Sequence, residues 1–84
     1  MNPYTDIDAD TRKFTKDIDA TDLVWHRDRE DRIIESIFDT DWLIQIENEL
    51  PKNINRPISI KSGVWHRLIK GTGDLTLKII KENG

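Results

Sequence analysis

The chain has 84 residues, which is enough for one domain and too few for two. It has no cysteine, so disulfides cannot stabilise it, and thirteen basic residues against sixteen acidic ones give a net charge of −3. This balance disfavours a general nucleic-acid binder, which needs a basic surface to displace counterions from phosphates. Aspartates interrupt the N-terminal region and the apolar runs are short, so neither a signal peptide nor a transmembrane helix is predicted. We therefore expect a cytoplasmic protein without nucleic-acid or membrane partners.

The N-terminal part of the chain has little hydrophobic pattern. Residues 1–10 predict a loose arm, and residues 11–84 are expected to form a single domain. Residues 12–15 predict a short edge strand anchored by Phe14. Residues 16–22 are rich in Asp and Thr and predict a turn.

Short β-type segments make up the rest of the chain. Alternating apolar and polar side chains, with many β-branched and aromatic residues, predict six strands, at residues 23–28, 32–38, 42–47, 57–60, 64–70 and 75–80. The segments between them carry Asp, Asn, Pro or Gly and predict turns and loops, at residues 39–41, 49–56, 61–63 and 71–73. Several short strands joined by small turns indicate an all-β, antiparallel barrel or sandwich.

One tetrapeptide occurs twice. Residues 24–27 read Val-Trp-His-Arg, and residues 64–67 repeat the same four residues. Side chains alternate between the two faces of a strand, so each copy presents its histidine on one face and its tryptophan on the other. If the two segments are neighbouring strands, His26 and His66 point to the same side.

The second copy resembles the second motif of the cupin family. That motif reads glycine, five residues, Pro-x-Gly-x-x-His, and then an asparagine after three more residues. Gly63 and His66 match the motif. Asn55 stands at the leading glycine, Lys61 at the proline and Lys70 at the asparagine.

The first copy is similar to the first cupin motif at fewer positions. That motif reads His-x-His, three or four residues, glutamate, six residues, glycine. His26 matches the first histidine, whereas Asp28, Arg32 and Asp39 occupy the other three positions. The resemblance covers residues 24–81, and it implies an antiparallel cupin-like β-barrel, also called a jelly roll or double-stranded β-helix.

A metal site is the first candidate for function. His26, Asp28 and His66 are the residue types of a two-histidine, one-carboxylate triad, which leaves open positions on a divalent metal such as Fe, Zn, Ni or Mn. Glu30 lies on the same predicted face and could replace Asp28. In the alternative, the histidines are hydrogen-bonded in a polar pocket and Asp28 pairs with an arginine. Neither alternative specifies a reaction, so whether the protein is an enzyme stays open.

A binding pocket is expected beside this triad. Its candidate lining residues are Glu30, Arg32 and Gln45. The charged run at residues 26–32 could bind a small polar or anionic molecule, because arginine makes bidentate contacts with carboxylate or phosphate. It could instead form a local network of ion pairs, which are common on surfaces and weak. The predicted function is therefore metal or small-ligand binding, with a metal-free binding or interaction module as the alternative.

The tryptophans of the two copies predict an interface. Trp25 and Trp65 are expected side by side on the outer face, and an apolar area of that size favours association. A domain this small also hides little of its own surface. We expect a homodimer, which the cupin resemblance also implies. In the alternative, the N-terminal arm covers the two tryptophans, with Tyr4, Ile7 and Phe14 folding across them.

Overall fold

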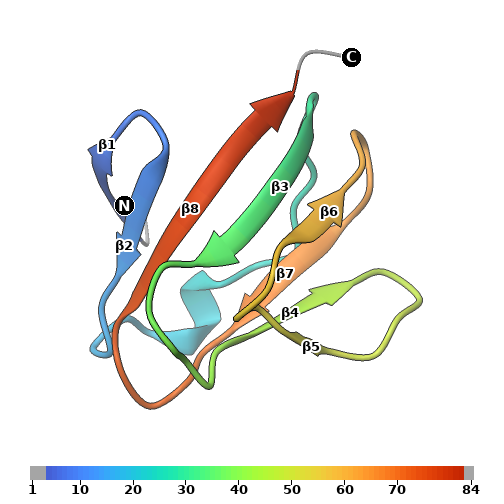
Figure 1. Ribbon diagram of the computed structural model, residues 1–84. Coiled ribbons are helices and arrows are strands. Elements are labelled where there is room, and N and C mark those ends of the chain that lie inside the picture. Colours follow the sequence, from blue (N-terminus) through green and yellow to red (C-terminus); the bar gives the residue numbers. More distant parts are fainter. Residues whose placement is uncertain (1–3, 83–84) are drawn as a thin grey trace.

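The computed structural model describes residues 4–82, and within them the chain forms eight strands and one short 3-10 helix (Figure 1). In chain order the strands are β1 Thr5–Asp8, β2 Thr11–Phe14, β3 Asp31–Ser36, β4 Leu43–Ile46, β5 Lys52–Asn53, β6 Ile58–Ile60, β7 His66–Ile69 and β8 Leu75–Glu82. The helix, η1 Ala20–Asp22, lies between β2 and β3. In this part of the chain no helix has both the length and the apolar character needed to span a membrane.

The strands form two antiparallel sheets. One has the order β1-β2-β8-β3-β6 and the other has the order β5-β4-β7. The all-β, antiparallel prediction is confirmed. The closed barrel is not formed, because no ladder among the described strands joins the two sheets. The edge strands β5 and β6 are only two and three residues long, so they offer few backbone groups for closure.

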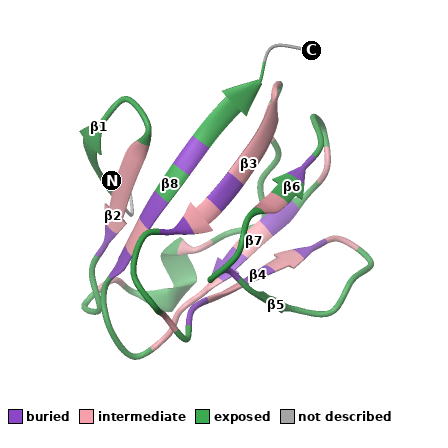
Figure 2. Ribbon diagram, viewed as in Figure 1, coloured by how far each residue is buried: buried purple, intermediate pink, exposed green. Residues whose placement is uncertain are grey.

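The core lies between the sheets and follows the alternation along the strands. On β8, Leu75, Leu77 and Ile79 are buried, while Lys78 and Ile80 face solvent (Figure 2). The same alternation buries every second side chain of β4 and β7. Alternating burial along these three strands therefore gives each of them one inward face.

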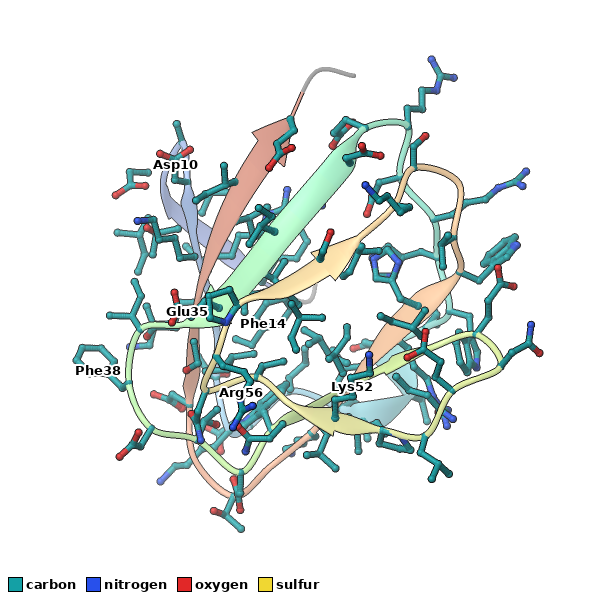
Figure 3. All side chains as sticks on the ribbon, turned by 45° about the vertical axis from the view of Figure 1, so that its right-hand side comes forward. Asp10, Phe14, Glu35, Phe38, Lys52 and Arg56 are labelled. Carbon is teal, nitrogen blue, oxygen red and sulfur yellow. The ribbon has the colours of Figure 1, made fainter. Side chains whose placement is uncertain are left out.

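Aromatic residues divide between the core and the surface. Trp42 is fully buried, its indole Nε1 donates to the carbonyl of Gly73 at 2.7 Å, and its ring packs against Phe14. Figure 3 shows Phe14 in the interior and Phe38 at the periphery, where 68% of it is exposed. Gly71 approaches the Trp42 backbone so closely that a Cβ would collide with it, which explains a glycine in this turn.

The N-terminal region is more ordered than the sequence suggested. Within the expected loose arm, residues 5–8 form β1, which pairs with β2. The Arg12 guanidinium donates to Asp6 at 3.0 Å and lies 4.2 Å from the ring centroid of Tyr4. Polar and cation–π contacts therefore hold a strand that has no hydrophobic period. Residues 1–3 of the expected arm lie outside the described residues.

Two further segments differ from the sequence-based expectation. Residues 23–28 form only an isolated bridge at His26, instead of a complete strand. The preceding helix η1, capped by the Asp19 side chain, takes the chain out of extended conformation just before this segment. The loop expected at residues 49–56 contains the two-residue strand β5.

Candidate metal centre

The two tetrapeptide copies lie side by side, joined at their histidines. The His26 N–H donates to the His66 carbonyl at 3.0 Å, and the His66 N–H donates to the His26 carbonyl at 2.9 Å. This double exchange defines an antiparallel bridge between the two histidines. Each histidine is therefore the direct cross-strand neighbour of the other.

The outer face of the paired copies shows why this tetrapeptide suits an antiparallel arrangement. With the histidines opposite each other, the tryptophan of one copy faces the arginine of the other. The Arg27 guanidinium lies 5.1 Å from the Trp65 ring centroid, and the Arg67 guanidinium lies 4.9 Å from that of Trp25. Val-Trp-His-Arg is thus complementary to itself, with two cation–π pairs flanking the histidines.

The second copy is positioned by a turn and by β4. Gly63 has φ of 78°, in a turn closed by the Val64 N–H donating to the Lys61 carbonyl at 3.2 Å. Only glycine adopts that conformation freely, which accounts for the match to the motif at this position. On β7, His66 pairs with Ile46 of β4 and is 4% exposed. The alternation of β7 therefore places a histidine on the apolar inner face.

The two imidazoles make the same contact with the backbone. Nδ1 of His26 lies 3.1 Å from the Val24 carbonyl oxygen, and Nδ1 of His66 lies 2.9 Å from the Val64 carbonyl oxygen. A carbonyl oxygen only accepts hydrogen bonds, so each Nδ1 carries the hydrogen, and each neutral ring keeps its lone pair on Nε2. A backbone carbonyl bound to the other ring nitrogen is the usual support of a metal-binding histidine. The ring centroids are 4.3 Å apart.

Asp28 brings a carboxylate to these rings. Its Oδ2 lies 3.2 Å from Nε2 of His66, is buried, and has no hydrogen-bond partner among the described residues. Burial lowers the pKa of His66 below its ordinary value; His26 and Arg32 act in the same direction, against the Val64 carbonyl and Asp28. In the neutral ring, a nitrogen lone pair faces a carboxylate oxygen. A cation between the two atoms would satisfy both.

The three residues fit a single metal ion. One ligand atom from each of His26, Asp28 and His66 lies within 4.8 Å of the other two. Two ligands of one ion, each about 2.1 Å from it, can be at most about 4.2 Å apart. Small side-chain movements would therefore bring all three atoms within coordination distance of one ion, and the exposed ring of His26 has room to move. Three protein ligands leave positions open on the ion.

Residues 28–32 also form the local network of ion pairs that is the alternative to anion binding. Glu30 Oε1 accepts from Nε and Nη2 of Arg32 at 2.8 and 2.7 Å. This hydrogen bond lowers the pKa of Glu30. Arg32 also lies 3.3 Å from Oδ1 of Asp28. Glu30 is therefore committed to Arg32 and does not replace Asp28, while Arg32 leaves the second oxygen of Asp28 free for the histidines.

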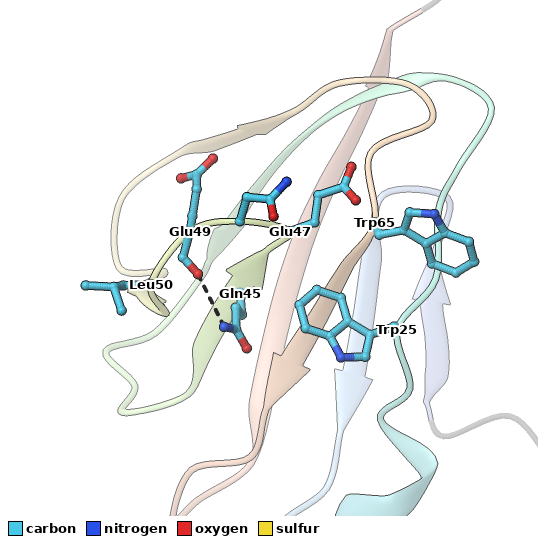
Figure 4. Close-up of a pocket in the computed structure, with 7 residues that line it drawn as sticks. Trp25, Gln45, Glu47, Glu49, Leu50 and Trp65 are labelled. Atoms are coloured by element: carbon cyan, nitrogen blue, oxygen red, sulfur yellow. Dashed lines mark hydrogen bonds between the residues drawn. The ribbon is translucent and has the colours of Figure 1, made fainter.

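Gln45 lies away from the histidines, contrary to its predicted place in the pocket. On β4 the inner positions belong to Ile44 and Ile46, so Gln45 points to the outer face. Its side-chain oxygen accepts from Arg67 at 2.9 and 3.1 Å. Its side-chain nitrogen donates to the Glu49 carbonyl at 3.2 Å, as Figure 4 shows. Alternation along the strand could have revealed this position.

A cavity of about 250 Å³ opens beside the triad, between the two sheets. Both histidines and Arg32 line one part of it. Its walls are mostly apolar and come from both sheets, with Phe14, Ile34, Ile44, Leu68, Leu77 and Ile79 among them. Val24, which is 60% exposed, also lines the cavity, so the cavity opens to solvent and has room for water or a small ligand.

A shallower depression of about 580 Å³ lies on the outer face. Trp25 and Trp65 line it and are 39% and 41% exposed, and Leu50 at its rim is 84% exposed (Figure 4). The described part of the N-terminal arm does not cover it, because β1 pairs with β2 in the other sheet. The predicted common face of the two tryptophans is confirmed.

Comparison of the chain with protein-family models, curated proteins and solved structures gave no match. The cupin resemblance therefore remains a prediction, carried by Gly63 and His66 and their spacing. What the chain does has to be inferred from the geometry of its own residues.

Proposed function

We propose that the protein binds one divalent cation through Nε2 of His26, Nε2 of His66 and Oδ2 of Asp28. The observation that carries this proposal is the buried Asp28 Oδ2, which lies 3.2 Å from Nε2 of His66 and has no hydrogen-bond partner within residues 4–82. A cation beside a buried carboxylate oxygen in that position would offset the cost of burying its charge. The carbonyl contacts of both Nδ1 atoms already leave both Nε2 atoms free to bind a metal.

The ligand set narrows the choice of metal. Two imidazoles and one carboxylate suit Zn, Fe(II), Ni or Mn better than Ca or Mg, which prefer oxygen ligands. A bound ion would act as a Lewis acid towards a small molecule at its open positions. The resemblance of Gly63 and His66 to a cupin motif supports the same chemistry.

A proton is the competing cation. If Nε2 of His66 were protonated, it would form an ion pair with Asp28 and no metal would be needed. Burial lowers the pKa of His66, which disfavours that form at neutral pH. A metal-free pocket that binds small polar molecules is the functional alternative, and zinc titration separates the two.

Isothermal titration calorimetry of chelator-treated protein with zinc tests the proposal. We expect one zinc per chain. His26→Ala, Asp28→Asn and His66→Ala should each weaken binding by more than the roughly 10- to 100-fold that loss of a supporting residue costs. Asp10 is an exposed carboxylate outside the group of possible ligands, so Asp10→Asn is the matched control and should bind zinc like the wild type. Unchanged zinc affinity in any of the three ligand variants would contradict the proposal.

We further propose that the outer face mediates homodimer formation. Trp25, Trp65 and Leu50 expose apolar surface within one depression, and a second copy would cover it. Sedimentation velocity should give a dimer for the wild type and a monomer for Trp65→Ser. Phe38→Ser removes an exposed aromatic outside this depression and should remain a dimer. A wild-type monomer at every concentration would exclude the dimer.

A further inference from the structure

We infer that the cavity between the sheets binds a small monocarboxylate with an apolar body, its carboxylate directed towards the histidines and Arg32. This inference rests on the proposed metal site, because the cation supplies part of the charge that the carboxylate would meet. A carboxylate held in the cavity would lie beside the open positions of the proposed ion.

The walls of the cavity determine the body of the ligand. They are built from the inward rows of both sheets, including Ile34 of β3, Ile44 of β4 and Ile79 of β8. Branched aliphatic walls offer a ligand body no hydrogen bonds, so they select apolar groups. An apolar cavity of about 150 Å³ already accepts benzene. At about 250 Å³, this cavity fits a longer alkyl chain or a substituted ring.

Charge determines the head of the ligand. Asp28 and Glu30 carry one negative charge each, and Arg32 carries one positive charge. A divalent ion with the two neutral histidines would leave this end of the cavity with one net positive charge. A monoanion balances that charge. Glu30 and Asp28 engage Nε and Nη2 of Arg32, but its guanidinium has further N–H donors for a carboxylate, and its side chain lines the cavity and is only 12% exposed.

The remaining charged groups at the cavity do not alter this balance. Arg12 is paired with Asp6 and stacked on Tyr4, so its charge is already matched. Asp22 is exposed at the surface, where water screens it. Val24 is 60% exposed and also lines the cavity, so the opening lies beside the first tetrapeptide copy. A ligand would therefore enter next to His26.

Calorimetry of the zinc-loaded protein with hexanoate, octanoate and 1-octanol tests the ligand class. Each buried methylene contributes roughly a factor of four in affinity, so octanoate, with two more methylenes, should bind about 15-fold more tightly than hexanoate. Octanol has the same chain without the charge and should bind at least about tenfold more weakly than octanoate, because charge-assisted bonds to the head are lost.

Two neighbouring isoleucines of β8 provide a matched pair of variants. Ile79 is 5% exposed and lines the cavity, whereas Ile80 is 43% exposed and faces outward. Ile79→Phe should fill the cavity and weaken octanoate binding at least about tenfold, and Ile80→Phe should leave it unchanged. If Ile79→Phe does not fold, intermolecular NOEs in the wild type replace it. Octanoate protons should then contact the methyl groups of Ile34 and Ile44 and not those of Ile80.

The results separate this inference from the metal proposal. Zinc binding without octanoate binding, or octanoate binding that survives Ile79→Phe and shows no NOE to Ile34 or Ile44, would overturn the ligand assignment and leave the metal site intact. Octanoate binding by chelator-treated protein that takes up no zinc would contradict the metal site and the charge assigned to the head of the ligand, and would leave only the apolar cavity as its binding site. Absence of both would overturn both.

Discussion

The two copies of Val-Trp-His-Arg have the same sequence and the same local contacts but different surroundings. In both, Nδ1 of the histidine donates to the carbonyl two residues earlier, and the tryptophan stacks with the arginine of the other copy. Yet His66 is 4% exposed within β7, whereas His26 is exposed at a single bridge. The tetrapeptide therefore determines side-chain direction and partner, while the adjoining strands determine burial.

Removing each histidine should separate these two effects. In the presence of a chelator, His66→Ala should lower the free energy of unfolding by about 2–3 kcal/mol, because it leaves a cavity in the core. His26→Ala should cost less than about 1 kcal/mol, because its ring is exposed. Urea denaturation measures both. Equal losses would mean that burial does not distinguish the copies.

Acid should act on the metal-free protein through the buried copy. Burial lowers the pKa of His66, so below about pH 6.5 the unfolded chain binds a proton that the folded protein resists. The free energy of unfolding is therefore highest above that pH. As the pH falls from there to the lowered pKa of folded His66, this free energy decreases by at most about 1.4 kcal/mol per pH unit.

Denaturation with chelator at about pH 7.5 and about pH 5.5 checks this pH dependence. The wild type should lose more stability between the two than His66→Leu, which has no proton to bind at this position. An equal loss in both proteins would show that the titration of His66 makes no contribution to stability.

The smallest expected effect concerns the outer face, where the copies are most alike. Double-mutant cycles for Arg27 with Trp65 and for Arg67 with Trp25 should each give about 0.5–1 kcal/mol of coupling, typical of exposed cation–π pairs. The two values should agree closely, since the guanidinium-to-ring distances are 5.1 and 4.9 Å. Coupling in only one cycle would show that the pairing of the copies is not symmetric.

Alternation and spacing predicted much of the inner site. They placed His26 and His66 on one face and both tryptophans on the other, because the period of two holds wherever the backbone is extended. Asp28 reached the same site although no complete strand forms there, since it lies two residues after the bridging His26. Gln45 faces outward instead, because Ile44 and Ile46 take the inner positions of β4.

Other features depend on contacts that a linear pattern does not encode. Strand β1 is held by the contacts of Arg12 with Asp6 and Tyr4 rather than by a hydrophobic period. The two sheets stay separate, with edge strands β5 and β6 of only two and three residues, and composition does not specify strands this short. The cavity depends on the separation of the two sheets, a property of the assembled fold.

The imidazole nitrogens provide the most direct measurement of the metal site. Long-range ¹H–¹⁵N NMR spectra of the chelator-treated protein should show both His26 and His66 with hydrogen on Nδ1. Addition of one equivalent of zinc should shift both Nε2 resonances and leave both Nδ1–H groups in place. Zinc binding through Nδ1, or a shift of only one ring, would contradict a site shared by the two copies.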